Sequence, residues 1–454
     1  MIKAGKLVFL LTFFALLVQS VYLFLDRADE LLAVPFALLL GGAGAYFLGQ
    51  ASDEDSEFQV NIFLWAFSVR IWMSILFYGW DLTGVFGDED ASGYMAGWGH
   101  AESWYEGGIN AFVDSLSFVF FEAQNVGQGL IWGVPMFIAG GPSRMIVSIL
   151  NGFAGAMLVI VVFRISRRVF DSATGRIAAV LVTFWASYIL LSAGTSKEIL
   201  VILMEWTILY LLIRNPVGFT FKDSVVALPA LLALYVMRFY ALYLVAAAFM
   251  FRFIVARREH IVRNVVFGSL VVGSVLIFLN AGGVISRDFA RLERQNTVIE
   301  GWRENVAEQT GSGVEVYSEY ESTTVAIPVA TAYFFLAPFP WDIASGTMRN
   351  AFGAVENIFL YVILILGFPA LKIFFKDKFI DLAPIFVFCV LYSGMHIWGL
   401  SNVGLAWRHK QTIMPLFFML AAVAITQRRA GMQFISERTG RKRRRDGLTV
   451  IKAG

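Results

Sequence analysis

Three consecutive acidic residues, Asp88, Glu89 and Asp90, follow closely after an apolar run at residues 58–80. A carboxylate at the mouth of such a run can act as a general base on a hydroxyl group, or hold a divalent cation through its oxygen atoms. The competing interpretation is a solvated loop in which the three acids do no chemistry. Which interpretation holds depends first on the side of the membrane that the cluster faces.

Two further positions carry charge where an apolar run begins or is interrupted. Lys197 and Glu198 start the run at residues 199–213, where the ammonium group could bind a substrate anion or merely neutralise the neighbouring carboxylate. Arg238 interrupts the stretch ALPALLALYVMRFYALYLVAAAF. An ionisable side chain at membrane depth is costly and indicates a functional site, although a residue that snorkels from a sharp turn is the alternative.

A third charged group, Arg408, His409 and Lys410, precedes the last apolar run. A guanidinium group can hold a phosphate through two parallel hydrogen bonds. We therefore expect Arg408 to contact a lipid phosphate or pyrophosphate, with His409 and Lys410 beside it. Tyr94, close to the acidic cluster, could stack on a sugar or a lipid, whereas aromatic residues at a membrane interface are commonly anchors.

The amino-acid composition indicates a membrane protein. Of 454 residues, 58% are hydrophobic and only 15% are charged, whereas soluble domains carry about a quarter of charged residues. The sequence therefore predicts an all-α protein, a polytopic bundle of about twelve transmembrane helices. The expected spans are residues 6–25, 31–50, 58–80, 143–163, 175–193, 199–213, 223–237, 240–256, 264–281, 351–371, 380–398 and 411–427.

Two shorter apolar pieces, residues 126–141 and 325–341, are broken by Gly and Pro, and we expect them to be interfacial or re-entrant. The positive-inside rule places basic clusters in the cytoplasm. All four basic clusters of this chain fall on that side only if neither short piece crosses the membrane. These clusters lie at residues 164–168, 252–263, 372–378 and 441–445. Both chain termini are then cytoplasmic.

Two long loops, residues 81–125 and 282–324, face outward in this topology, and the acidic cluster lies in the first of them. One segment fits poorly, because several acids fall on the cytoplasmic side. They are Asp53, Glu54, Asp55 and Glu57. Acidic residues have little weight in the positive-inside rule, so the topology stands.

A single membrane domain, residues 1–427, accounts for nearly all of the chain, and we expect the basic tail at residues 428–454 to be disordered against anionic lipid. The sequence has no signal for cleavage after the first apolar run, no metal-ligand spacing of His and no phosphate-cradling glycine loop. Cys389 is the single cysteine, which excludes an intramolecular disulfide. We expect no cofactor and no nucleic-acid partner, although the outward carboxylates could hold a divalent cation.

The order of these motifs resembles the GT-C superfamily of membrane glycosyltransferases, which use polyprenyl-phosphate-linked sugars. The resemblance covers residues 58–425. It rests on the acidic cluster, GGPSR, RISRRVF, SKE, the arginine between two short spans, AYFFLAPFPW and WRHKQTIMPLF.

The resemblance implies a role for several residues. Asp88, or next Glu89, would be the catalytic base, Glu198 a second acidic position, and Arg408, with Lys410, the contact to the lipid-linked phosphate. It further implies an inverting transfer of a hexose or pentose to a lipid, glycan or protein acceptor at the outer face of a bacterial inner membrane.

Two alternatives remain open. An O-antigen or exopolysaccharide polymerase, acting on polyprenyl-pyrophosphate-linked repeat units, is favoured by the three spans before the first long loop and by outward arginines. Four such arginines lie in the second loop, Arg287, Arg291, Arg294 and Arg303. A transporter or flippase without chemistry is the other alternative, although such proteins usually carry inverted repeats that are not discernible here.

Overall fold

A computed structural model of the chain describes residues 2–24, 28–50, 54–80, 82, 91–122, 126–214, 220–255, 323–344, 348–400 and 402–428. These residues form helices joined by turns, and no β-strand occurs among them. The expected all-α class is therefore confirmed for this part of the chain. Several expectations lie outside the described residues: Asp88 and Glu89, the span at 264–281, nearly all of the second outward loop, and the tail beyond residue 428.

Most helices follow the apolar runs of the sequence, but α5 lies within residues 81–125, where the sequence predicted a long outward loop. The N-terminal half contains α1 (Ile2–Phe24), α2 (Ala33–Gly49), α3 (Ser56–Gly79), α5 (Ala91–Ser117), α6 (Gln128–Ala139), α7 (Arg144–Val169), α8 (Ser172–Phe184), α9 (Ala186–Ala193) and α10 (Glu198–Arg214). The C-terminal half contains α11 (Phe221–Met237), α12 (Phe239–Val255), α16 (Thr323–Leu336), α17 (Met348–Gly367), α18 (Ala370–Ile373), α19 (Phe379–Trp398), α20 (Val403–Lys410) and a C-terminal helix (Met414–Arg428).

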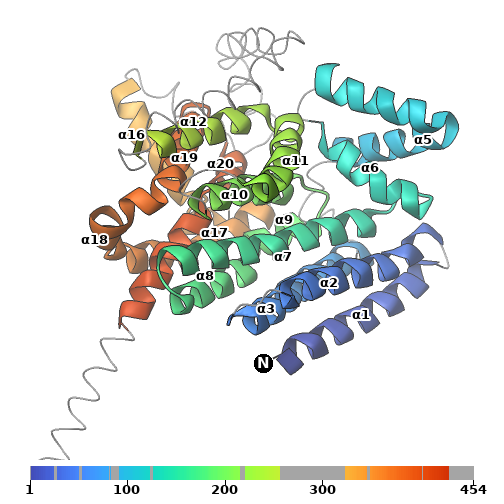
Figure 1. Cartoon of the computed structure of the whole chain (residues 1–454), viewed down its shortest axis with the longest axis horizontal. Helices are drawn as coiled ribbons and strands as arrows, with labels where there is room; N and C mark the ends of the chain where they lie inside the picture. Colours follow the sequence, from blue (N-terminus) through green and yellow to red (C-terminus); the bar gives the residue numbers. More distant parts are fainter. Residues whose placement is uncertain are drawn as a thin grey trace, which may run out of the picture.

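Helix α7 is the central scaffold, and it packs against α2, α3, α8, α9 and α10 (Figure 1). Its apolar stretch is 83% buried. Ser143 caps its N-terminus, because the Ser143 hydroxyl accepts a hydrogen bond from the Ile146 N–H at 3.2 Å. Arg167 and Arg168 lie in its last turn, where the helix dipole favours positive charge.

The described residues contain six helices long and apolar enough to cross a membrane, or up to eight if each of two bent helix pairs counts as one span. The expected number of spans is therefore not confirmed. Three of the expected spans correspond to α10, α11 and α12, which have 17 residues each. At about 1.5 Å per residue such a helix is roughly 25 Å long, which is shorter than a hydrocarbon core of about 30 Å.

Two consecutive helix pairs are sharply bent, and the residues at the two bends are in contact. The α8–α9 pair bends by 53° at Trp185, and α20 bends by 58° against the C-terminal helix. The Trp185 Nε1–H donates to the Gln411 side-chain oxygen at 2.9 Å, and the Tyr188 hydroxyl donates to the Gln411 carbonyl at 2.7 Å. Non-helical backbone at membrane depth is tolerated when it is buried in protein and its polar groups are satisfied, as they are here.

The two apolar pieces expected to be interfacial or re-entrant form short helices, α6 with 12 residues and α16 with 14. The end of α16 lies inside the protein, where side chains satisfy its carbonyl groups. The Leu336 carbonyl accepts from Asn357 Nδ2 and from the Tyr361 hydroxyl, each at 2.9 Å. Both helices are shorter than the roughly 20 residues of a typical span, and their interfacial or re-entrant placement stays a prediction.

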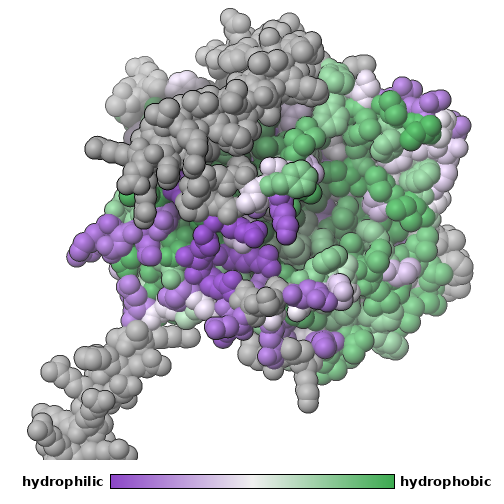
Figure 2. Space-filling model, viewed as in Figure 1, coloured by the Kyte–Doolittle hydropathy of each residue, from purple (hydrophilic) through white to green (hydrophobic). Residues whose placement is uncertain are grey.

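Large apolar side chains lie exposed on the outer helices, as a lipid environment requires. Phe14 of α1 exposes 64% of its surface, Phe47 of α2 73% and Phe359 of α17 62%. In the view of Figure 2, hydrophobic residues cover most of the right-hand part of the molecule, and hydrophilic residues gather left of and below the centre. The described part of the chain is therefore compatible with a membrane protein.

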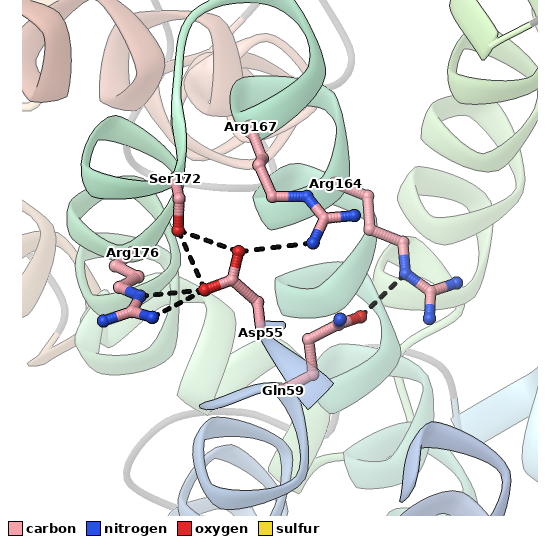
Figure 3. A network of polar contacts seen from close by, with 6 residues as sticks. All are labelled: Asp55, Gln59, Arg164, Arg167, Ser172 and Arg176. Carbon is pink, nitrogen blue, oxygen red and sulfur yellow. Dashed lines mark hydrogen bonds and ion pairs between the residues drawn. The ribbon is translucent and has the colours of Figure 1, made fainter. Parts of the chain in front are cut away.

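One residue of the acidic segment that fits the topology poorly, Asp55, is neutralised by arginine side chains (Figure 3). Asp55, which precedes α3, accepts hydrogen bonds from Arg176 Nη2 at 2.6 Å, Arg167 Nη1 at 3.2 Å and the Ser172 hydroxyl at 2.8 Å. Arg164 Nε donates to the Gln59 side-chain oxygen at 2.8 Å. Asp55 therefore lies beside arginines assigned to the cytoplasm, which explains how an acid is accommodated there.

We expect Asp55→Asn to lower the stability of the detergent-solubilised protein at pH 7 by about 1–2 kcal/mol, because charge-assisted hydrogen bonds are lost. Burial disfavours ionisation of Asp55, but hydrogen bonds from Arg176, Ser172 and Arg167 outweigh this effect and hold its pKa below the ordinary value of 3.8. Because the folded-state pKa is the lower one, the stabilisation is fully present well above 3.8 and is lost as the pH falls through and below that value.

Thermal unfolding of both proteins as a function of pH is the measurement, with Glu57→Gln as a control at an exposed acid of the same helix start. An equal effect of the two substitutions, or a difference that persists at pH 2, would contradict a stabilising role of Asp55.

Candidate functional site

A buried ion pair between Glu198 and Arg238 forms the centre of the candidate site. Arg238 Nη2 donates to both carboxylate oxygens of Glu198, at 2.5 and 2.6 Å, and the two side chains are 4% and 3% exposed. Glu198 is the first residue of α10, while Arg238 is the single residue between α11 and α12. The pair that the sequence singled out as two separate charges is therefore one contact.

Local sequence explains why the chain turns at Arg238. Thr220 and Asp223 form a reciprocal capping box that begins α11, in which each side chain accepts a hydrogen bond from the other's backbone N–H. After 17 residues α11 ends, and the Arg238 backbone leaves the helical conformation, with φ −160° and ψ 76°. The turn places a guanidinium group inside the protein, at the junction of two short helices.

Tyr392 of α19 connects the ion pair to the region of the C-terminal helix. Its hydroxyl accepts hydrogen bonds from Arg238 Nη1 and from the Thr412 hydroxyl, each at 3.1 Å, and lies 3.2 Å from His409 Nδ1. His409 stacks on His396, with ring centroids 3.8 Å apart.

Among the described residues, three cations act electrostatically on the Glu198 carboxylate. Besides Arg238, both Arg408 and Lys197 lie close enough to act on the Glu198 carboxylate electrostatically. Lys197, Arg408 and His409 are partly exposed, whereas Glu198 and Arg238 are buried. An excess of accessible cations around a neutralised core is suited to binding an anion.

Residues that sequence reasoning missed hold the turn that carries Lys197. Asn151 of α7 donates from Nδ2 to the carbonyls of Gly194 and Ser196, each at 3.0 Å. Arg70, fully buried in α3, donates from Nε to the Ser192 hydroxyl at 3.2 Å. Polar residues inside apolar runs are unusual, so Arg70 and Asn151 could have been noticed in the sequence. The sequence does not indicate which residues they contact.

Lys410 lies in a second buried network. Its ammonium group donates to the Ala337 carbonyl at 2.7 Å and to Asn357 Oδ1 at 2.8 Å, and the residue is 1% exposed. Glu356 of α17 acts on it electrostatically. The structure therefore separates Lys410, whose ammonium group is held by α17 and the end of α16, from its neighbours Arg408 and His409.

Helix α5 packs on α6, and the residue before α6 contacts the last turn of α11 ahead of Arg238. Glycines allow α5 and α6 to pack closely: a Cβ atom at Gly133 would lie 2.9 Å from the Gly97 carbonyl oxygen. The Gly127 N–H, just before α6, donates to the Val236 carbonyl at 3.1 Å. Asp88 and Glu89 lie outside the described residues, but α5, which begins at Ala91, is thus connected to the Arg238 turn.

Tyr94 is buried on α5, and the Arg144 guanidinium group lies 5.1 Å from its ring centroid. Its side chain therefore packs against the start of α7. This contact neither supports nor excludes the predicted stacking of Tyr94 on a sugar or lipid.

An apolar pocket of about 410 Å³ shares helix α19 with the site. It lies between α16, α18, α19 and the C-terminal helix. Its lining includes Ser393, Ile397 and Ile413, which are sequence neighbours of Tyr392, His396 and Thr412. Val390 at this pocket exposes 52% of its surface, which places the pocket at the protein surface.

Comparison with known proteins adds no assignment: the chain matches no family model and none of the curated proteins. Among the described residues, no three His, Cys, Asp or Glu side chains form a group that could hold a metal ion. The site is therefore defined by its cations, its buried ion pair and the neighbouring apolar pocket.

The α5–α6 contact gives a prediction with a matched control. Gly133→Ala would force its new methyl group against the Gly97 carbonyl, so we expect a loss of about 1–3 kcal/mol in stability. Gly99→Ala, on the same pair of helices, meets nothing within 4 Å and is expected to be neutral or to gain up to about 1 kcal/mol. Thermal unfolding decides, and equal effects would contradict the close packing.

Tyr392→Phe removes the hydroxyl that joins Arg238, Thr412 and His409. We expect a stability loss of about 1–3 kcal/mol, because buried polar groups lose a partner, together with weaker binding of anionic lipid. Tyr105→Phe is the control, since it likewise loses a hydroxyl that donates to a backbone carbonyl, that of Phe137 in α6. Unchanged anion binding in Tyr392→Phe would remove Tyr392 from the site.

Proposed function

We propose that the protein is a membrane glycosyltransferase that moves a sugar from a polyprenyl-phosphate donor to a lipid, glycan or protein acceptor at the extracytoplasmic face. The observation that carries this proposal is the adjacency of two features. Two partly exposed cations, Arg408 and Lys197, lie around a neutralised ion pair, and an apolar pocket is lined by α19, the helix that carries Tyr392. A lipid phosphate combines the anion and the apolar chain that these features would bind.

In the proposed reaction, Arg408 and Lys197 hold the donor phosphate, and Arg238, fixed by Glu198 and Tyr392, adds a preorganised positive charge. Asp88, or next Glu89, accepts the proton of the acceptor hydroxyl. The acceptor oxygen bonds to the anomeric carbon as the bond from that carbon to the phosphate oxygen breaks. The configuration inverts, and the polyprenyl phosphate leaves with the bonding electrons.

The proposed topology has about twelve spans in a bacterial inner membrane, with both termini in the cytoplasm. The Asp55 contacts support it, because they bring together an acid and arginines assigned to one side. The connection from α5 through α6 to Val236 likewise supports a common face for the acidic loop and the cations. Lys410 remains a candidate substrate contact only if its present partners release it.

The second candidate is a polysaccharide polymerase acting on polyprenyl-pyrophosphate-linked repeat units. It is favoured by α1, α2 and α3, three long apolar helices before the acidic loop. The same cations would hold a pyrophosphate. The four arginines that would favour it further, residues 287–303, lie outside the described residues.

A lipid transporter or flippase is the remaining alternative. The two broken helix pairs favour it, because discontinuous helices often form substrate sites in transporters. The direct contact of the two breaks, through Trp185 and Gln411, places them at one location in the bundle.

The test compares Asp88→Asn and Arg408→Ala in cells, with Arg176→Ala as a control on the opposite side. We expect the first two variants to reach the membrane and yet to lack one sugar or branch, as a deletion strain does. Purified Arg408→Ala should bind polyprenyl monophosphate about ten- to a hundredfold more weakly, because one charge-assisted contact is lost.

Other outcomes select the alternatives. Short or single-repeat chains that contain every sugar would support the polymerase. Complete glycans with lipid-linked intermediates trapped on the cytoplasmic side would support the flippase. A wild-type glycan profile in Asp88→Asn would contradict the transferase.

A further inference from the structure

Helix α20 carries the two partly exposed residues of the site, Arg408 and His409, yet it has only 8 residues. Helices this short are not stable alone, so their orientation depends on tertiary contacts. Asn402 caps the N-terminus, because its side-chain oxygen accepts from the Leu405 N–H at 2.6 Å. The other contacts that fix α20 involve charged groups.

One face of α20 is bound to neighbouring helices. Trp407 Nε1 donates to Glu356 at 3.3 Å, and the Lys410 ammonium group donates to the Ala337 carbonyl and to Asn357. Trp407 and Lys410 are three residues apart and share a face. Arg408 and His409 lie about 100° and 200° around the axis from Trp407, on the side turned away from that face.

Glu356 and Lys410 act on each other electrostatically, and each is bound by other groups of the protein. The Glu356 carboxylate accepts from the Ser187 N–H at 2.6 Å and from the Ser187 hydroxyl, at the N-terminus of α9, where a helix dipole favours negative charge. Lys410 lies at the C-terminal end of α16, where the dipole favours positive charge. Glu356 is 4% exposed and Lys410 is 1% exposed.

Burying charged groups is costly, and apolar residues of similar volume often stabilise a protein equally well or better. We propose that Glu356 and Lys410 are positioning residues, which set the orientation of α20 and thereby hold Arg408 and His409 beside the Glu198–Arg238 pair. This inference rests on the proposed function. It assigns Lys410 an indirect role in place of the predicted contact with substrate, and it adds Glu356, which the sequence did not indicate.

The test is a double-mutant cycle on the full-length protein in nanodiscs, with Glu356→Gln, Lys410→Met and the two combined. Each variant is measured for its thermal unfolding midpoint and for its affinity for polyprenyl monophosphate. We expect each single change to lower the midpoint strongly, because it leaves one buried charge uncompensated. The double variant should recover much of the midpoint but bind the lipid roughly ten- to a hundredfold more weakly, because Arg408 is displaced.

Two further variants separate positioning from stability. Glu356→Asp keeps the charge and should restore most of the affinity that Glu356→Gln loses. Asp55→Asn, at the cytoplasmic cluster, should lower the midpoint without changing the affinity.

A double variant that folds and binds like the wild type overturns the proposal. The proposal is also overturned if the affinity of the Glu356 and Lys410 variants falls only in proportion to their thermal unfolding midpoints. If all the Glu356 and Lys410 variants fail to fold, the pair belongs to the fold alone and the proposal is again overturned. If the wild-type protein does not bind polyprenyl monophosphate, the proposed function itself fails, which is a different result.

Discussion

The buried pair of Glu198 and Arg238 is the constraint on which the rest of the site depends. Removing two charges from water is costly, and their attraction compensates only when the remaining hydrogen-bonding groups are satisfied as well. The structure meets this condition with Tyr392, which binds the second guanidinium nitrogen. Helices α10, α11, α12 and α19 are therefore brought to one point, and Thr412 connects the C-terminal helix to it.

The broken helices follow the same requirement for satisfied polar groups. In the turn between α20 and the C-terminal helix, two backbone carbonyls accept hydrogen bonds from side chains of other helices. Trp206 Nε1 donates to the Thr412 carbonyl at 2.8 Å, and Tyr188 donates to that of Gln411. Buried aromatic donors thus hold irregular backbone inside the bundle, which allows Arg408 and His409 to reach the site from a short helix. The outcome is a rigid interior with a cationic rim, next to an apolar pocket.

The sequence predicted the all-helical class because apolar runs are long and unambiguous. The bends at Trp185 and Gln411 left no comparable pattern, and the expected number of spans was not confirmed. The misplaced acid Asp55 was visible in the sequence, but its neutralisation by Arg167 and Arg176 required contacts across more than 100 residues.

Some residues of the candidate site could be recognised in the sequence, and others could not. Glu198, Arg238 and Arg408 were recognisable because charges are rare and costly in an apolar chain, and the structure brings them together. Tyr392 was missed because a tyrosine in an apolar run is ordinary, and its contact with Arg238 spans 154 positions. Lys410 was grouped with its neighbours by adjacency, yet consecutive helical residues point about 100° apart and so reach different partners.

The most direct test of the account is a cryo-EM structure of the protein in nanodiscs with an excess of polyprenyl monophosphate. The account predicts phosphate density within hydrogen-bonding distance of Arg408, next to the Glu198–Arg238 pair. The first isoprene units should enter the apolar pocket beside Phe386 and Gly394. Lipid phosphate bound instead at the cytoplasmic arginines around Asp55, or a pocket that stays empty while the lipid binds elsewhere, would contradict it.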